Sequence, residues 1–199
     1  YVSNDGDDSG QGTIDDPLAT PGMAIYKASA GDSVLLFEGS YGEILFDKKL
    51  FIGSVHFANL DSTIIQNTQV GKISVDHANW TEIIGLNIVG NDNGVEFQGQ
   101  GMNISISYCH ITASDVGIYS TDSWTIIDNC IITGCEQAII SRSNMGNTLS
   151  ITINNSEITG NDFDWALIAN DNNTILNLTI NNTIISNNTG GTSIIDLDN

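Results

Sequence analysis

The feature that most constrains the fold is a short phrase that recurs through the second half of this 199-residue chain. Each copy spans six residues and has isoleucine at both ends; the copies are residues 83–88, 106–111, 127–132, 153–158 and 180–185. The last isoleucine therefore recurs at steps of 23, 21, 26 and 27 residues. Self-similarity at a period of roughly 20–30 residues is typical of a solenoid, in which each repeat forms one coil.

Two further sets of apolar residues recur at nearly the same steps. One contains the first isoleucine of each copy: Ile83, Ile106, Ile127, Ile153 and Ile180. The other follows the phrase: Val95, Ile118, Ile139, Leu167 and Ile194. Three such registers predict three parallel sheets, with coils about 4.8 Å apart and like residues stacked inside. We expect a single all-β solenoid domain over residues 1–199, with its coils in residues 32–199.

The first part of the chain reads as the start of that stack. Residues 1–31 comprise a short strand, an acidic loop and a helix. Thr20 is the expected N-cap, Pro21 the first helical residue and Gly31 the stop, which gives a helix of about ten residues. We expect this helix to cover the open end of the first coil. Strands are then predicted at residues 32–37, 44–46, 50–53 and 63–65, with turns at 39–42 and 48–49.

The acidic loop of residues 1–16 contains Asp5, Asp7 and Asp8, followed by Asp15 and Asp16. Carboxylates are oxygen ligands that calcium prefers, so these residues are candidate calcium ligands. The loop lacks the full spaced-acid pattern that ends in Glu, and Asx and Gly turns need the same residues. We therefore favour a plain turn over a calcium site, and expect no other cofactor.

The opening of the chain resembles a known family. The residues that bear the likeness are 1–3, Gly12-Thr13, 16–20, Ala24-Ile25, Gly31-Asp32, 37–41 and Ile52-Gly53. They look like the start of right-handed parallel β-helix proteins of the pectin-lyase-like superfamily. That resemblance implies a right-handed three-sheet parallel β-helix. It leaves activity open, because the superfamily holds polysaccharide lyases, glycoside hydrolases, phage tailspikes and catalytically silent surface proteins. The Asn/Ile/Thr-rich coils look most like archaeal adhesin-like and cell-envelope proteins.

Asparagines and cysteines also recur with the coils. Asn129, Asn155 and Asn182 fall between two registers, where a corner needs the left-handed conformation that asparagine tolerates. Cys109 and Cys130 share the register of Leu86, so we expect them inside on neighbouring coils, either as a disulfide or as two buried thiols. Cys135 matches a register of turn residues, from which we expect an outward thiol able to crosslink a second subunit; that register contains Asn91, Ser114, Asn161 and Asn188.

The charge of the chain limits its partners. There are 24 acidic residues and five basic ones, for a net charge of −19. This balance argues against nucleic acid, anionic membranes and acidic polysaccharides, and favours cations. No apolar run approaches the ~18 residues of a membrane span.

The start at Tyr1, without Met or a hydrophobic leader, is expected for a processed or excised chain. Asn-x-Ser/Thr sequons support an extracellular, glycosylated protein; they begin at Asn79, Asn103, Asn154, Asn172, Asn177, Asn181 and Asn187.

Catalytic patterns are scarce. Polysaccharide elimination needs a strong base near bound calcium, and beyond Lys72 the only basic residue is Arg142, which we place alone in a turn. The Gly-His-Gly and Arg-x-Lys patterns of the superfamily's glycosidases do not occur. Carboxylate pairs at 162/164 and 196/198 are expected by chance in so acidic a chain. The three histidines, His56, His77 and His110, lack metal-type spacing. We therefore predict no enzyme.

The leading hypothesis is a non-enzymatic structural protein of a cell envelope, surface-layer or sheath-like, that associates with itself. Its assembly edge is the last register, which the sequence leaves without a cap: Ser193, Ile194, Ile195, Asp196 and Leu197. The alternative is an adhesin or carbohydrate-binding module, with a candidate sugar-stacking strip of Trp80, Trp124, Trp165, Tyr108 and Tyr119. A polysaccharide lyase or hydrolase is the third hypothesis.

Overall fold

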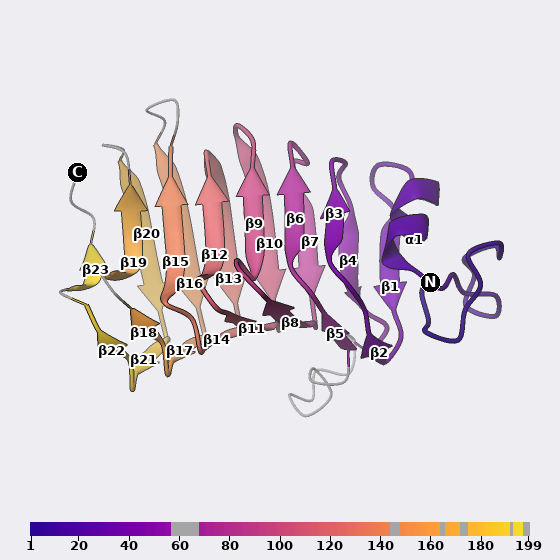
Figure 1. Cartoon of the computed structure of the whole chain (residues 1–199). Coiled ribbons are helices and arrows are strands. Elements are labelled where there is room, and N and C mark those ends of the chain that lie inside the picture. Colours follow the sequence, from indigo (N-terminus) through magenta and orange to yellow (C-terminus); the bar gives the residue numbers. More distant parts are fainter. Residues whose placement is uncertain (57–67, 144–147, 164–165, 172–174, 192, 197–199) are drawn as a thin grey trace.

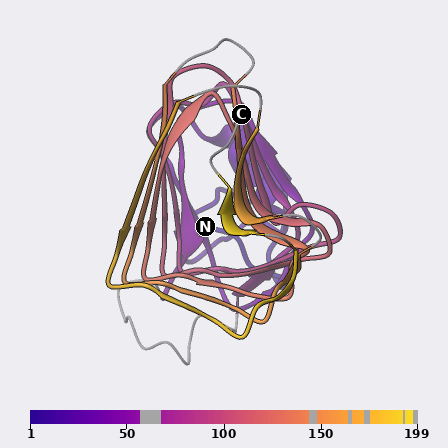
Figure 2. The same ribbon diagram turned by 90° about the vertical axis from the view of Figure 1, so that its left-hand side faces the viewer.

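The computed structural model describes residues 1–56, 68–143, 148–163, 166–171, 175–191 and 193–196. The backbone winds into a stack of coils, and each complete coil gives one strand to each of three parallel sheets (Figure 1). Seen along the stack, the three sheets form the sides of a triangle (Figure 2). The predicted three-sheet parallel β-helix with one short helix is thus confirmed.

We call the three sheets A, B and C. Sheet A contains β1 (Ser33–Leu36), β4 (Phe51–Ser54), β7 (Thr81–Ile84), β10 (Met102–Ser107), β13 (Ser123–Asp128), β16 (Leu149–Asn154) and β20 (Leu176–Asn181). Sheet B contains β2 (Gly39–Ser40), β5 (Thr68–Val70), β8 (Asn87–Gly90), β11 (His110–Ala113), β14 (Ile131–Ile132), β17 (Glu157–Thr159) and β21 (Ile184–Ser186). Sheet C contains β3 (Ile44–Phe46), β6 (Ile73–Asp76), β9 (Val95–Gln98), β12 (Val116–Thr121), β15 (Gln137–Arg142), β19 (Ala166–Asp171) and β23 (Ser193–Asp196). A small two-stranded sheet joins β18 (Asp162–Phe163) to β22 (Thr189–Gly190).

The two isoleucine registers lie where the sequence predicts them. In sheet A, Ile106 pairs with Ile83 and Ile127, and the column continues to residues 153 and 180. In sheet B the column runs through residues 88, 111, 132, 158 and 185. The members up to residue 158 are fully buried. Each buried isoleucine contributes roughly 1.5–3 kcal/mol relative to an exposed one, so these columns contribute substantially to stability.

The third register was predicted one residue out of step at its end. Ile139 pairs with Ile168, which pairs with Ile195, rather than with Leu167 and Ile194. The reason is a local break in the inward–outward alternation, since Leu167 and Ile168 are both fully buried. The preceding coil does the same with Ala138 and Ile139. The alternation of inward and outward residues along a strand cannot show which of two adjacent buried residues pairs with the column on the neighbouring coil.

The N-terminal end of the stack is covered. Helix α1 (Pro21–Lys27) begins as predicted, with the Thr20 hydroxyl accepting a hydrogen bond from the Met23 N–H. It ends earlier than predicted, because Ala28 is already extended. Lys48 donates to the carbonyls of Ile25 and Ala28, so a side chain from the first coil holds the end of the helix. The predicted turn at residues 39–42 instead begins with β2.

The other end of the stack differs. Inward residues Leu176, Leu178 and Ile180 of β20 are only half-buried, whereas Ile151 and Ile153 below them are fully buried. The predicted edge residues 193–196 do form the last strand of sheet C, β23. Leu197 lies outside the described residues, as does the strand predicted at residues 63–65. The last described coil therefore presents apolar side chains that no further coil of this chain covers in the structure.

The corners between sheets A and B confirm the asparagine prediction. Asn129, Asn155 and Asn182 have φ angles of 52°, 49° and 46°. Asn182 donates to the Asn155 side-chain oxygen at 2.8 Å, and Asn155 donates to Asp128 at 3.0 Å. Tyr108 holds the same position on an earlier coil, also with positive φ. We call Asn129, Asn155 and Asn182 the asparagine ladder; it turns the chain and links neighbouring coils.

Candidate functional site

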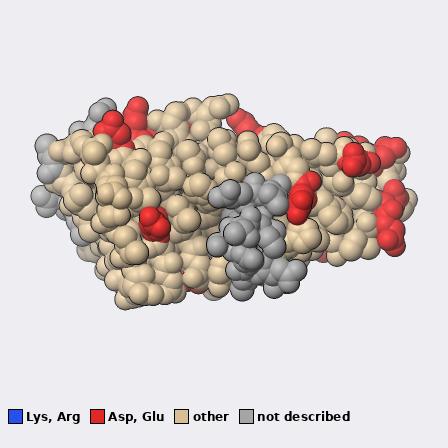
Figure 3. Space-filling view, turned by 90° about the horizontal axis from the view of Figure 1, so that it is seen from below, with Lys and Arg blue, Asp and Glu red and all other residues tan. Residues whose placement is uncertain are grey.

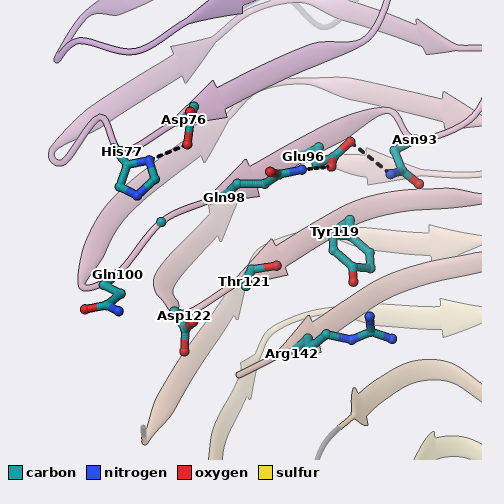
Figure 4. Close-up of a pocket in the computed structure, with 11 residues that line it drawn as sticks. Asp76, His77, Asn93, Glu96, Gln98, Gln100, Tyr119, Thr121, Asp122 and Arg142 are labelled. Atoms are coloured by element: carbon teal, nitrogen blue, oxygen red, sulfur yellow. Dashed lines mark hydrogen bonds and ion pairs between the residues drawn. The ribbon is translucent and has the colours of Figure 1, made fainter. Parts of the chain in front are cut away.

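The outer face of sheet C contains a groove of about 520 Å³. Its floor comes from outward residues of β6, β9, β12 and β15, and its rims come from the turns before and after β9 (Figure 4). The lining is almost wholly polar: Asp76, His77, Asn93, Glu96, Gln98, Gly99, Gln100, Tyr119, Thr121, Asp122 and Arg142. Period-2 alternation places the lining residues that lie in strands, such as Glu96, Gln98 and Tyr119, outside while their neighbours fill the core.

A hydrogen-bonded network occupies the middle of the groove. Glu96 forms an ion pair with Lys72 and accepts hydrogen bonds from Gln98 and Asn93, the last at 3.2 Å. Burial alone would raise the pKa of the Glu96 carboxyl, but the bonds from Lys72, Gln98 and Asn93 outweigh burial and lower the pKa. The Glu96 carboxyl is therefore held ionised at neutral pH, with its oxygens fixed in place.

The far end of the groove pairs a cation with an aromatic ring. The Arg142 guanidinium lies 5.7 Å from the centre of the Tyr119 ring, within cation–π range. Asp122 accepts a hydrogen bond from the Ser143 hydroxyl at 2.6 Å. Arg142 was predicted to stand alone in a turn, which is wrong. It is the last residue of β15, paired with Thr121 of β12, so sheet pairing sets its position.

A second hollow of about 240 Å³ continues the groove toward the N-terminal end. It shares Asp76, Glu96 and Gln98 with the first hollow and extends to Leu45 and Lys72. The two together follow sheet C across β3, β6, β9, β12 and β15. An elongated polar groove of this kind suits a chain-like ligand that makes many hydrogen bonds.

Sequence reasoning missed this constellation. Lys72 and Glu96 come from coils that are neighbours in space, because Ser74 pairs with Glu96. The useful signal is the coil period itself, which places residues 72 and 96 one coil apart. The period could not be projected that far back, since the repeating phrase begins only at Ile83.

The candidate calcium ligands form turns and caps, as the sequence pattern favoured. Asp8 accepts hydrogen bonds from the N–H groups of Ala19 and Thr20 and from the Thr20 hydroxyl. Asp7 accepts from the Ser9 N–H, which lowers the pKa of the Asp7 carboxyl. Within the described residues, no three His, Cys, Asp or Glu side chains gather in a way that could hold a metal ion.

All three cysteines are buried free thiols. Cys109 and Cys130 lie inside in the register of Leu86, as predicted, and in the structure they are two buried thiols rather than a disulfide. Cys135 was predicted to face outward, and this is wrong: it is 2% exposed. Burial raises the pKa of the Cys135 thiol to about 11, which makes it unreactive at neutral pH. The register assignment was right, because the Cys135 N–H donates to the Asn161 side-chain oxygen on the next coil, but this turn points into the core.

The predicted aromatic strip divides between faces. Trp80 and Trp124 are 62% and 49% exposed and lie along the same side of sheet A, two coils apart. Tyr119 lies in the groove on sheet C, and Tyr108 is at a corner between sheets A and B. Trp165 is outside the described residues. A single strip is therefore not formed.

The described histidines lie apart from one another. His56 lies 3.7 Å from Glu38, and His77 contacts Asp76 at the rim of the groove. His110 lies on the outer face of sheet B, where partial burial lowers its pKa. That face shows isolated acidic side chains and no Lys or Arg in its described part (Figure 3).

The six sequon asparagines within the described residues are exposed or half-buried, as glycosylation requires. Four of them, at positions 103, 154, 177 and 181, face outward from sheet A. Two amide nitrogens already have partners: Asn103 donates to Asn79 at 3.1 Å and Asn181 donates to Asn154 at 2.9 Å. Asn172 is outside the described residues. Glycosylation stays a prediction.

Comparisons with known proteins show the fold. No protein-family model and no curated protein matches the sequence. The structure of pectate lyase Pel9A is similar, with a TM-score of 0.58 at 13% identity over 92% of this chain and 62% of the lyase. A pectin methylesterase from Aspergillus niger has a TM-score of 0.50 at 11% identity over 94% of this chain and 85% of the esterase. The chain thus spans less than two thirds of the pectate lyase. At these identities the likeness establishes the parallel β-helix fold alone.

Within the described residues, no helical segment has the length and apolar character that a bilayer crossing requires.

Proposed function

We propose that this chain is a non-enzymatic carbohydrate-binding module of an extracellular surface, which holds a neutral glycan along the groove on sheet C. The observation that supports this function best is the groove itself. It is elongated, it is lined by amides, hydroxyls and carboxylates, and it places an aromatic ring, Tyr119, beside a guanidinium, Arg142. Such side chains offer both donors and acceptors to a sugar's hydroxyl groups.

The charge of the groove favours a neutral ligand. Asp76, Glu96 and Asp122 line it together with Arg142, and the whole chain has a net charge of −19. An acidic polysaccharide would be repelled over a long range. The two structural neighbours are named for pectate and pectin, so pectin of high and low methyl esterification belongs in a binding test. We expect the neutral, esterified form to bind better.

The network around Glu96 supports binding over catalysis. Glycoside hydrolysis needs a carboxyl group that keeps its proton near neutral pH, in addition to a carboxylate. Glu96 has the opposite property, because its hydrogen bonds lower its pKa. Its oxygens are therefore suited to accept hydrogen bonds from a ligand or to order their neighbours.

Calorimetry with soluble neutral oligosaccharides tests the proposal. The Arg142→Gln and Tyr119→Ala variants should each weaken binding roughly tenfold or more, since anchors of this type dominate interfaces. Val89→Ala, an exposed residue of sheet B, is the matched control and should bind as the parent does. Unchanged affinity in both groove variants would contradict the proposal. Chromatography of the same oligosaccharides after incubation tests for catalysis, and shortened products would make the protein an enzyme.

A second function rests on a separate observation, the uncovered last coil. Leu176, Leu178 and Ile180 are half-buried there, and so is Ile185, the inward residue of β21. Strands at such an edge also have unpaired backbone groups. The opposite end of the described stack is covered by α1. We propose that two copies pair tail to tail, giving a closed dimer rather than the sheath-like array predicted from sequence.

Sedimentation velocity of the 199-residue chain at micromolar concentration tests this pairing. A dimer that dissociates when Ile185 is replaced by lysine supports it. A monomer at all concentrations contradicts it, while leaving glycan binding at the groove unaffected.

A further inference from the structure

The outer face of sheet A is a regular array of uncharged polar side chains. Each of β10, β13, β16 and β20 turns alternate residues outward, and the strands pair without a shift. The outward residues form three columns: Asn103–Trp124–Ser150–Asn177, Ser105–Ile126–Thr152–Thr179 and Ser107–Asp128–Asn154–Asn181. We call these residues the sheet A array. Neighbouring strands lie about 4.8 Å apart and alternate residues about 6.8 Å apart, so hydroxyls and amides repeat in two dimensions.

Contacts within the array hold its side chains in place. Asn181 donates to Asn154, and Asn154 lies beside the asparagine ladder at the end of the sheet. The Trp124 indole N–H donates to the Thr148 carbonyl at 3.3 Å, which fixes the ring while leaving half of its surface exposed. A surface whose side chains are already ordered loses less conformational entropy when a ligand binds.

The charge pattern indicates the kind of partner. The chain has 24 acidic residues, yet the array has one, Asp128. Asp128 accepts hydrogen bonds from Asn129 at 2.8 Å and from Asn155 at 3.0 Å. A face with a single acidic residue on a strongly anionic protein is complementary to an uncharged partner, since a cationic partner would prefer the more acidic surfaces.

The shape of the array indicates the partner's form. In the view along the stack, the strands of sheet A run straight along one side of the triangle (Figure 2). Trp124 and Ile126 stand next to each other on the outer side of β13 and are 49% and 48% exposed. A flat face with apolar side chains among hydroxyls and amides matches a flat surface that also alternates C–H and hydroxyl groups.

We propose that the sheet A array adsorbs to the surface of an ordered, insoluble, neutral polysaccharide, in which parallel chains present such a repeating surface. This site is distinct from the groove, which is proposed to bind a single soluble chain. A single polysaccharide chain can contact only a small part of a flat protein face, whereas several aligned polysaccharide chains can contact all three columns of the array together. The two sites would let the module attach to a solid polysaccharide and hold a free chain at the same time.

The test is adsorption to solid polysaccharide. Protein from a host without N-glycosylation is mixed with microcrystalline cellulose or chitin, and the unbound fraction is measured. The Ser105→Lys/Thr152→Lys double variant places two charges in the middle column and should weaken adsorption at least tenfold. Thr112→Lys/Thr159→Lys, on the outer face of sheet B, is the matched control with the same added charge and should adsorb as the parent does. Melting curves of each variant confirm that the fold is intact.

Two other variants separate this inference from the proposed function. Arg142→Gln alters the groove and should leave adsorption to the solid unchanged. Trp124→Ala should reduce adsorption and leave binding of soluble oligosaccharide unchanged. If the Ser105→Lys/Thr152→Lys variant adsorbs as strongly as the parent, the array is not the binding face and the inference is wrong. Binding of the parent to ice crystals with no adsorption to either polysaccharide would also overturn it.

Discussion

The outer faces of sheets A and C are built on the same coils, yet their side chains differ in kind. Between β6 and β15, sheet C turns Asp76, Glu96 and Arg142 outward, and its turns raise a rim around them. From β10 to β20, sheet A is flat and its outward columns contain a single charge, Asp128. The inward columns beneath both faces are alike, because both must fill one core. In a solenoid, the inside is therefore fixed by packing, and the outside of each sheet is free to acquire its own chemistry.

The corners that border the two faces differ in the same way. The asparagine ladder borders sheet A with neutral side chains that bond to each other. The corner between sheets B and C instead stacks exposed acids, Asp92, Asp115 and Glu136, on successive coils. We call these three residues the acidic column. The contrast between a neutral side and a charged side of the molecule thus extends from the sheets to their borders.

The largest expected effect tests whether the sheet A array is dispensable for folding. Ile126 and Ile127 are adjacent in β13, but Ile127 is fully buried and Ile126 is 48% exposed. Ile127→Ala should lower the free energy of unfolding by about 2–5 kcal/mol through lost burial and a cavity. Ile126→Ala should change it by less than about 0.5 kcal/mol. Urea unfolding measures both. Similar losses at the two positions would mean that the array is part of the structural core.

The second effect tests whether the groove on sheet C contributes to stability through its charges. Lys72→Met removes the ion-pair partner of Glu96, and both side chains are largely buried, with 19% and 13% exposed. The free energy of unfolding at pH 7 should fall by about 1–2 kcal/mol. Lys49→Met, an exposed lysine in a turn, removes the same charge elsewhere and should cost much less.

The pH dependence of the same variant gives a sharper check. The pKa of Glu96 is lowered in the folded state, so its network stabilises the fold above the ordinary glutamate pKa of about 4.3 and loses that contribution as pH falls through the lowered value. The stability of the parent should therefore fall more than that of Lys72→Met between pH 7 and pH 3. Parallel curves would show that Glu96 is not coupled to Lys72.

The third effect concerns the neutral border. Asn155 has a φ of 49°. Holding alanine in this left-handed conformation costs about 1–2 kcal/mol, whereas glycine adopts it at little cost. Asn155→Ala should thus destabilise the protein by about 1–2 kcal/mol more than Asn155→Gly, because both variants lose the exposed bonds to Asp128 and Asn182 but only alanine is strained at this φ. Thermal unfolding separates the two. Equal losses would assign the role of Asn155 to its side-chain hydrogen bonds and not to its backbone.

Much of the fold could be predicted because the core imposes it on the sequence. The isoleucines at 83, 106 and 127 must stack, so their spacing alone reveals the length of each coil. The left-handed corners were predictable for a similar reason, since asparagine is one of few residues suited to them. Prediction failed where two adjacent residues are both buried, as at Leu167 and Ile168.

The candidate site was far less predictable. No packing rule restricts an outward residue, so Lys72, Glu96 and Arg142 have no pattern in the sequence that marks them as neighbours. Only the coil register brings them to one face. Cys135 is a further example. Its register was predicted correctly but its orientation was not, because whether a turn residue points in or out depends on the path of the turn and not on the spacing in the sequence.

The smallest expected effect concerns the charged border. Asp115 lies between Asp92 and Glu136 in the acidic column, and its N–H bonds to the Asp92 carbonyl at 3.2 Å. Exposed charges that face each other across neighbouring coils interact by about 0.2–1 kcal/mol, so relieving the repulsion with Asp115→Asn should raise the free energy of unfolding by an amount in that range. The gain should shrink at about 1 M salt, where charges are screened beyond about 3 Å. Asp47→Asn is the control: it replaces an exposed acid after β3 and lowers the net negative charge by the same amount, at a site outside the acidic column. If both substitutions stabilise equally, the repulsion belongs to the chain as a whole, and the acidic column does not set the side of sheet C apart from the side of sheet A.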